Sequence, residues 1–158
     1  MKPTIRQASA QDYDSLCELY NQVDALHREK FPDKFCKPQG PARDRNYILD
    51  LIEDENVGLF VADVDGKLAG FIHAIMHDTP PLAILAPRRY AVVDTMAVRQ
   101  DSRRIGIGQA LMEKACQWAA EKGATAMELN VYHFNEGAIA FYQALGYRAL
   151  RQQMSKAL

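Results

Sequence analysis

A β-α-β pattern in residues 90–132 constrains the fold of this chain more than any other feature of its sequence. Tyr90–Val98 is a strand-like apolar run, an apolar stripe recurs at helical spacing over Gln109–Lys122, and Ala126–Tyr132 alternates apolar and polar residues. Gly123 follows the stripe, where helices commonly end. Strands connected through a helix in this way lie parallel in one sheet. The pattern therefore predicts a sheet with at least one parallel pair of strands.

The region before this pattern predicts antiparallel strands instead. Asp65-Gly66 is a dipeptide that favours tight hairpin turns, and it separates apolar runs that begin at Val57 and at Lys67. The second run continues to Met76, and a proline-containing loop separates it from the next strand. Hairpins followed by a β-α-β unit predict a mixed sheet in an α/β fold.

The remaining predicted elements lie toward the two ends of the chain. They are a strand at Pro3–Gln7, a helix from about Ala10 to Lys30, a helix at Ala42–Glu53, a helix from Asn135 to Gly146, and a last strand near Arg148–Ser155. The predicted order is β-α-α-β-β-β-α-β-α-β around one mixed sheet. We expect a single domain over residues 1–158, because domains typically have about 100–200 residues.

Composition and charge exclude several classes of function. Hydrophobic residues make up 48% of the chain and charged residues 25%, as in ordinary globular proteins. The formal net charge of -1 provides no long-range field that would attract nucleic acid or an anionic membrane. No apolar run approaches the ~20 residues that span a bilayer. Cys17, Cys36 and Cys116 fit neither a disulfide framework nor a zinc site, so we expect a cytoplasmic protein.

The loop Arg103–Gly108 is the first candidate for a binding site. Gly106 and Gly108 stand between a predicted strand and a predicted helix, where glycine lets the backbone turn tightly and approach a ligand. The start of a helix presents unpaired N–H groups to an anion, so a pyrophosphate would fit there. The spacing matches neither the dinucleotide fingerprint nor a P-loop. A purely structural turn explains the two glycines equally well.

A second motif, Asn135–Tyr147, lies on the next predicted helix and just beyond it. Together the two motifs resemble those of the GCN5-related N-acetyltransferase (GNAT) superfamily, which carries Arg/Gln-x-x-Gly-x-Gly/Ala and then Asn-x-x-Ala-x-x-hydrophobic-Tyr-x-x-x-Gly-Phe/Tyr. The matching residues are Arg103, Gly106 and Gly108, then Asn135, Ala138, Phe141, Tyr142, Gly146 and Tyr147. The resemblance is strongest over Val93–Arg148, and the order of elements extends it over nearly the whole chain.

The resemblance implies that acetyl-CoA is the acetyl donor. Main-chain groups of the fourth strand would pair with its pantetheine arm as a neighbouring strand would, and N–H groups of the glycine loop would hold its pyrophosphate. The implied cofactor-binding residues are Met96, Ala97, Val98, Arg103, Arg104, Ile105, Gly106, Ile107, Gly108, Gln109, Asn135, Ala138 and Phe141. Asn135 is equally well explained as a helix N-cap, and Arg103 as a solvated loop residue.

The resemblance also implies a proton donor for the departing thiolate, and Tyr142 is the candidate. Its alternative role is that of a core aromatic residue. Members that acetylate protein N-termini often carry a glutamate five positions before the motif asparagine, but Asn130 stands there and cannot titrate. Asp94 and Glu128 are the remaining candidates for a general base, and each fits an ordinary surface strand equally well.

The expected acceptor is a primary amine of a small molecule or a peptide, attacking directly in a ternary complex. His27, Phe31 and Phe35 resemble the acceptor-side helix and loop of some small bacterial members, although His27 also fits simple packing at a helix end. Asn130 would orient the amine or a water molecule. His73 and His77 share one face of a strand, but two histidines are too few for a zinc site, so no metal is expected.

Three questions about the whole protein stay open at this level. A catalytically silent module that binds acyl-CoA and a transferase of a longer acyl group are alternatives to acetyl transfer. The exposed last strand permits a homodimer, through the sheet edge or through that strand. The sequence does not identify the amine.

Overall fold

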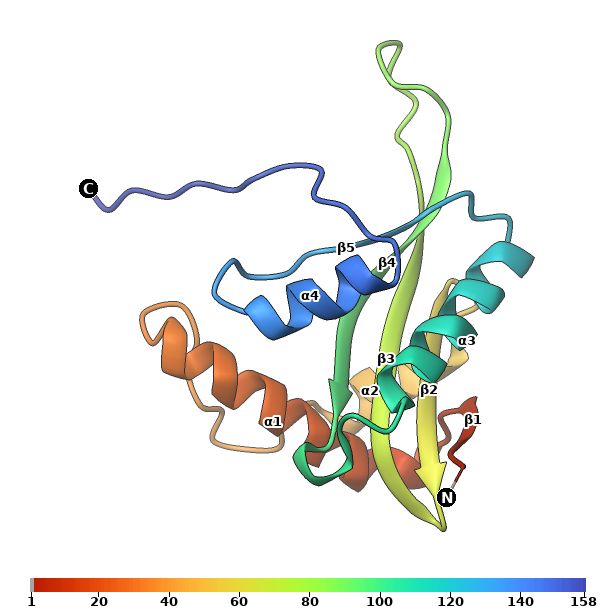
Figure 1. Cartoon of the computed structure of the whole chain (residues 1–158), viewed down its shortest axis with the longest axis vertical. Helices are drawn as coiled ribbons and strands as arrows, with labels where there is room; N and C mark the ends of the chain where they lie inside the picture. The colour runs from red at the N-terminus through yellow and green to blue at the C-terminus, as the bar shows by residue number, and fades with distance from the viewer. Residues whose placement is uncertain (1) are drawn as a thin grey trace.

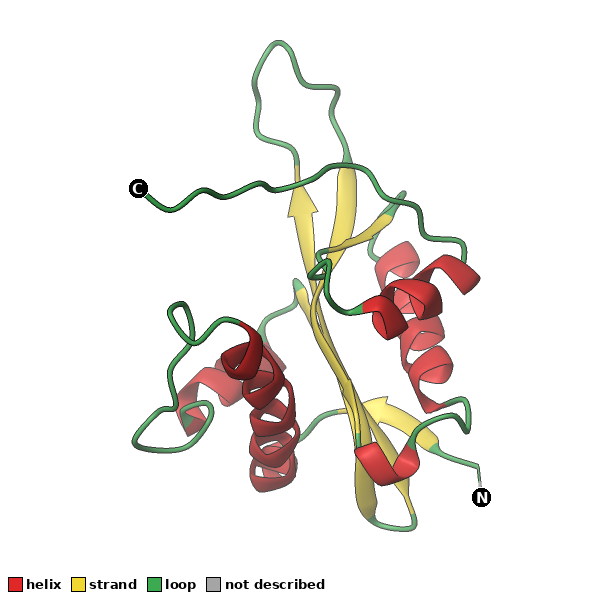
Figure 2. Cartoon of the chain, turned by 60° about the vertical axis from the view of Figure 1, so that its left-hand side comes forward, coloured by secondary structure: helices red, strands yellow, loops and turns green. Residues whose placement is uncertain are grey.

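A computed structural model describes residues 2–158 and shows a five-stranded mixed sheet with helices on both faces (Figures 1 and 2). The strands follow chain order across the sheet, and only the last pair is parallel. They are β1 (Thr4–Gln7), β2 (Val57–Val64), β3 (Lys67–Asp78), β4 (Arg89–Val98) and β5 (Met127–Leu129). The predicted α/β fold with a mixed sheet is confirmed.

Two pairs of helices cover the two faces of the sheet (Figure 2). The helices are α1 (Tyr13–Lys30) and α2 (Arg45–Glu53) on one face, and α3 (Ile107–Glu121) and α4 (Glu136–Ala144) on the other. Each pair buries its own apolar cluster, with Leu16 and Phe71 fully buried on the α1 side and Ile72 and Leu111 on the α3 side. Among residues 2–158, no helix is both long and apolar enough to span a bilayer.

The two parallel strands stay together over a short distance. β5 pairs with β4 only from Ala91 to Val93, whereas β4 continues to Val98. Beyond Val93 one edge of β4 is therefore left without a strand partner in the described chain. A bulge follows at once, because His73 is opposite Thr95 while Ala74 is opposite Val93.

Most predicted elements occur within a few residues of their expected bounds, with two instructive shifts. The second helix begins at Arg45 rather than at the predicted Ala42, with Asp44 as its N-cap. β5 ends at Leu129 rather than at Tyr132, because β4 no longer accompanies it. The alternating pattern beyond Leu129 therefore belongs to a loop.

The prediction of a last strand near Arg148–Ser155 is wrong for the single chain. Residues 148–158 form no strand, and they leave the body of the protein as an extended exposed segment (Figure 1). A strand needs a neighbour to pair its N–H and C=O groups, and the described chain provides none for this segment. The alternation of its side chains is thus insufficient to place it in the sheet.

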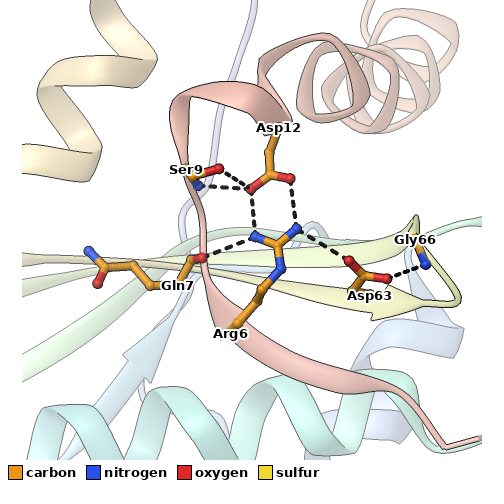
Figure 3. Close-up of polar contacts among 6 residues, drawn as sticks. All are labelled: Arg6, Gln7, Ser9, Asp12, Asp63 and Gly66. Atoms are coloured by element: carbon orange, nitrogen blue, oxygen red, sulfur yellow. Dashed lines mark hydrogen bonds and ion pairs between the residues drawn. The ribbon is translucent and has the colours of Figure 1, made fainter.

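An ion pair at the sheet edge ties β1 to the start of α1 (Figure 3). The Arg6 guanidinium donates to both carboxylate oxygens of Asp12, at 2.8 and 2.9 Å, and also to Asp63 on β2 at 3.3 Å. The Ser9 N–H donates to the same Asp12 carboxylate at 2.8 Å. These donors hold the pKa of Asp12 below its ordinary value, with the Arg6 hydrogen bonds as the largest cause.

We expect Asp12→Asn to lower the free energy of unfolding by about 2 kcal/mol at pH 7, because hydrogen bonds to a charged group are lost. A depressed carboxyl pKa stabilises the fold above the unfolded-state pKa, and this contribution disappears as pH falls through the folded-state pKa. The difference between parent and variant in urea unfolding should therefore shrink below about pH 4. Asp50→Asn, at an exposed position on α2, is the control. A difference at pH 3 as large as that at pH 7 would contradict this assignment.

Candidate active site

The open edge of β4 is the framework of the candidate site. The Arg99 N–H donates to the carbonyl of Ala69, on the neighbouring strand β3, at 2.7 Å. Because successive residues of a strand point their main-chain groups to opposite sides, Ala97 faces β3, while Met96 and Val98 face the open edge. A Cβ atom on Gly70 of β3 would lie 2.7 Å from the Ala97 oxygen, which agrees with this orientation. Of the three predicted positions, the geometry leaves Met96 and Val98 available for a pantetheine arm.

Two side chains already use the Val98 carbonyl. Gln22 of α1 donates to it at 2.9 Å, and Arg103 donates to it at 3.3 Å. The Arg103 side chain is exposed and also contacts the end of β4. A ligand strand that needs this carbonyl would have to share it with these donors. The N–H of Val98 and the main chain of Met96 have no such competitor in the described chain.

The glycine loop ends in the first turn of α3. Gly106 is the N-cap, with φ of 85°, a left-handed conformation that favours glycine, and its carbonyl accepts from the Ala110 N–H at 3.0 Å. Arg104 also has a positive φ, of 66°. The N–H groups of Ile107, Gly108 and Gln109 precede the first intrahelical bond, so they are free for an anion.

Gly108 has a packing reason as well. A Cβ atom there would lie 3.2 Å from Cζ of Phe141, so α4 approaches the start of α3 too closely for a larger residue. At Gly106 a Cβ atom would meet nothing within 4 Å. The structural-turn explanation therefore accounts for both glycines, through φ at Gly106 and through packing at Gly108, and it is compatible with an anion at the same helix start.

Asn135 serves as the N-cap of α4. Its Oδ1 accepts from the Ala138 N–H at 3.2 Å, as expected of a capping residue. This contact occupies the oxygen, while the Nδ2 donor finds no acceptor in the described part of the chain. The side chain can therefore cap the helix and still donate to a ligand.

Tyr142 lies among other aromatic rings on the α3 side of the sheet. Its ring centroid is 5.3 Å from that of Phe141 and 5.9 Å from that of Tyr147. Burial raises the pKa of Tyr142, so the hydroxyl holds its proton at neutral pH. A protonated hydroxyl in a half-buried cluster suits a proton donor and a core aromatic residue alike.

The two candidate carboxylates differ in their partners. The Asp94 carboxylate, on the bulge of β4, is 3.3 Å from Nδ1 of the buried His73. The Thr95 hydroxyl donates to it at 3.0 Å. These contacts lower the pKa of Asp94, with the hydrogen bond from His73 as the largest cause. Glu128 of β5 instead forms an ion pair with Arg88 at 2.9 Å.

The predicted acceptor residues come together in an aromatic cluster. His27, Phe31 and Phe35 meet Tyr132 and Phe134, which follow β5. The ring centroids of His27 and Tyr132 are 5.2 Å apart, and those of Phe31 and Tyr132 are 4.8 Å apart. Burial lowers the pKa of His27 and thus favours its neutral form. The cluster joins the end of α1 to the chain that leaves β5.

Asn130 lies directly after β5 and is exposed. Sequence reasoning missed Tyr132 and Phe134, because Tyr132 was predicted at a strand end and Phe134 lies between two predicted elements. The signal was the aromatic-x-aromatic spacing Tyr132-His133-Phe134 so close after a short strand.

His77, which was expected to share a face with His73, is exposed and stacks on Tyr90. No group of three metal-ligating side chains occurs among the described residues.

The same architecture occurs in solved acetyltransferase structures. An aminoglycoside N-acetyltransferase in complex with CoA has a TM-score of 0.73 at 18% identity, with 98% of each chain covered. A crystal structure of a variant of the BH1408 protein from Bacillus halodurans has a TM-score of 0.93 at 28% identity, covering 98% of this chain and 99% of that one. The chain thus shares its overall fold with these two proteins, the first of which is an acetyltransferase.

The chain belongs to the acetyltransferase (GNAT) family, whose sequence pattern it matches over residues 20–147. It is 33% identical over 144 residues to an uncharacterised N-acetyltransferase from Methanocaldococcus jannaschii. This match covers 91% of the chain but 60% of that relative, so the chain spans less than two thirds of the relative's length. The family and the relatives named N-acetyltransferase support an acyltransferase.

Proposed function

We propose that this chain transfers an acetyl group from acetyl-CoA to a primary amine by direct attack in a ternary complex. The observation that carries the proposal is the edge of β4 that no strand covers, where the main chain of Met96 and the N–H of Val98 have no partner in the described chain, next to free N–H groups at the start of α3. An amide-bearing arm can extend the sheet along this edge, and a pyrophosphate can accept from the helix start. Arg103 and Arg104 add positive charge at the same place.

The chemistry requires a neutral amine, a polarised thioester and a proton for the thiolate. The amine nitrogen attacks the carbonyl carbon, the C–N bond forms, and the C–S bond breaks. The nitrogen loses one proton to solvent water, and the sulfur gains one from the Tyr142 hydroxyl, which then recovers a proton from solvent. The main-chain N–H of Met96, facing the open edge, is the proposed donor to the developing oxyanion.

Asp94 is the proposed group that receives the amine, and Glu128 is the weaker candidate. The side chain of Asp94 is half exposed and faces the α1 side, where the aromatic cluster lies. Glu128 is already neutralised by Arg88. The five rings of the cluster provide a mainly apolar wall for an acceptor, which suits an amine carried on an apolar or aromatic body.

The decisive experiment is release of free thiol from acetyl-CoA with a panel of primary amines, peptides and polyamines. Turnover with at least one amine supports the proposal. Binding of acetyl-CoA with no turnover would favour the silent binding module, and faster turnover with a longer acyl-CoA would favour the alternative donor.

We also propose that two copies associate through the C-terminal segment. Residues 148–158 find no backbone hydrogen bond in the described chain, and the outer edge of β5 has no strand partner there. Leu150, Met154 and Leu158 are exposed and, in an extended chain, would share one face. Exchange of this segment between copies would pair both the segment and the edge of β5.

Gln109→Glu tests the anion site with a change that the helix tolerates. Gln109 is exposed in the first turn of α3, where a carboxylate interacts favourably with the helix dipole but repels a pyrophosphate. We expect calorimetry to show about tenfold weaker binding of CoA. The melting temperature should fall only slightly, because the exposed hydrogen bond from Gln109 to Glu113 becomes a like-charge pair while the helix dipole favours the new carboxylate. Gln109→Ala, which adds no charge, should bind CoA nearly as the parent does. Equal affinity in all three proteins would remove the pyrophosphate from this helix start.

Tyr142→Phe tests the proton donor. The ring and its packing remain, so a core aromatic residue would lose little activity, whereas a proton donor should lose about 10²-fold in kcat, the lower end of general acid catalysis. Thiolates leave readily, which explains the lower end. Tyr147→Phe, in the same aromatic cluster, is the matched control and should keep the parent kcat. A Tyr142→Phe variant with parental turnover would return Tyr142 to a structural role.

The association of two copies is tested by light scattering after gel filtration. The full chain should show twice the mass of one copy, and a chain ending at Tyr147 should show the mass of one. Arg151→Pro should weaken the dimer because proline removes one ladder donor, whereas Arg151→Lys should not. A full chain with the mass of one copy would contradict the proposal.

A further inference from the structure

His73 is a buried titratable residue that the proposed reaction does not use. Its side chain is 1% exposed, on the central strand β3. Nδ1 lies 3.3 Å from an Asp94 carboxylate oxygen and 3.5 Å from the Tyr20 hydroxyl. Nε2 is buried without a hydrogen-bond partner in the described part of the chain. Burying a polar ring nitrogen without a hydrogen bond costs folding free energy, so the contacts at Nδ1 must offset that cost.

The bulge in β4 is what brings Asp94 to His73. Met96 and Val93 both pack on the α3 side of the sheet, although strict alternation would put residues three apart on opposite faces. The extra residue at the bulge resolves the conflict, because Asp94 and Thr95 together face His73. Because of the extra residue, Asp94 lies on the face opposite to Met96, whereas strict alternation counted from Met96 would place both on the same face.

The contacts determine which ring nitrogen holds the proton. In the tautomer with hydrogen on Nδ1, that group points to the Asp94 carboxylate, the acceptor at Nε2 is left unpaired, and the Tyr20 hydroxyl loses Nδ1 as an acceptor. In the other tautomer, Nδ1 could accept from the Tyr20 hydroxyl, but its lone pair would also face the carboxylate, and a buried N–H at Nε2 would lack an acceptor. The first arrangement is therefore favoured.

Other charged and titratable groups act on the same pair from the α1 side. Tyr20 of α1 and Tyr47 of α2 carry no positive charge that could compete with His73 for Asp94. Burial raises the pKa of both hydroxyls. Arg43, from the loop before α2, contributes to the low pKa of Asp94 but is itself bound to Asp24 at 2.8 Å. His73 is thus the direct hydrogen-bond donor that acts most strongly on Asp94.

We propose that His73 is a positioning residue, whose Nδ1–H directs the Asp94 carboxylate toward the acceptor side, where it receives the ammonium group of the substrate. This inference rests on the proposed acetyl transfer for its consequence in catalysis. The pairing of His73 with Asp94 stands on the geometry alone, so the two parts can be tested separately.

Two substitutions of similar polarity separate positioning from packing. The amide nitrogen of Asn can occupy the place of Nδ1, whereas that of Gln reaches the place of Nε2. His73→Asn should therefore preserve the hydrogen bond to Asp94, and His73→Gln should lose it. We expect kcat/KM for the amine to fall by about 10- to 100-fold in His73→Gln and to stay within about threefold of the parent in His73→Asn.

The carboxyl titration of Asp94 gives a readout that does not depend on activity. Carbon NMR, with the Asp94 signal assigned through Asp94→Asn, should show a higher pKa in His73→Gln and a parental one in His73→Asn, because a hydrogen bond to the ionised form lowers the pKa. A merely structural histidine would leave the titration unchanged in both variants, and that result would overturn the proposal.

NMR of the parent protein provides a test that does not depend on whether any variant folds. Nitrogen NMR of the His73 ring should show hydrogen on Nδ1 and none on Nε2, and the opposite tautomer would overturn the pairing. If the titration and the tautomer agree but no amine is acetylated, the pairing stands and acetyl transfer is wrong. If transfer occurs but His73→Gln matches the parent, the positioning role is wrong.

Discussion

The early end of the β4–β5 pairing is the constraint on which the rest of the site depends. Three registered pairs hold the parallel strands together, and β4 then runs on for five residues from Asp94 to Val98. Because main-chain N–H and C=O groups are costly to leave unpaired in a protein interior, an open strand edge persists only where solvent or a ligand satisfies it. The sheet is thus preorganised to accept an extended, amide-bearing molecule at one place.

The bulge and the split act together, since they occur within three residues of each other. The split frees the main chain at Met96 and Val98, while the bulge turns the Asp94 side chain to the opposite side from Met96. The edge of β4 therefore presents main-chain groups, and the α1 face of the strand presents a carboxylate. Under the proposed function, a donor-binding edge would lie next to an acceptor-binding group without any extra element.

Much of the fold was predictable from sequence because its signals are local. Gly123 and Gly146 have positive φ just after α3 and α4, and the Asp65-Gly66 turn closes the β2–β3 hairpin. The last strand was not predictable, since alternation at residues 148–155 carries no information about whether a partner strand is in reach. Local pattern specifies conformation, and pairing needs the rest of the structure.

The candidate site divides in the same way. The glycine loop and the Asn135 cap follow from residue type and spacing. His27, Phe31 and Phe35 could also be grouped on the acceptor side from the sequence. The pairing of His73 with Asp94 was hidden, because it depends on a one-residue register shift that the sequence does not announce. A strict period of two counted from Met96 would have put Asp94 on the α3 face, and the bulge lets Val93 and Met96 share that face while Asp94 contacts His73.

The low pKa of Asp94 limits what this carboxylate can do. An alkylammonium has a pKa of about 10, whereas Asp94 titrates below its ordinary value of 3.8, so it is a very weak base toward the amine. It attracts the ammonium strongly, but moving the proton onto it is uphill by about six pKa units or more, which exceeds 8 kcal/mol. Water reached through the half-exposed side chain is the better final proton acceptor. In the proposed reaction, Asp94 therefore binds the ammonium form of the substrate, and the small fraction of neutral amine attacks. The amine proton passes to water rather than to Asp94.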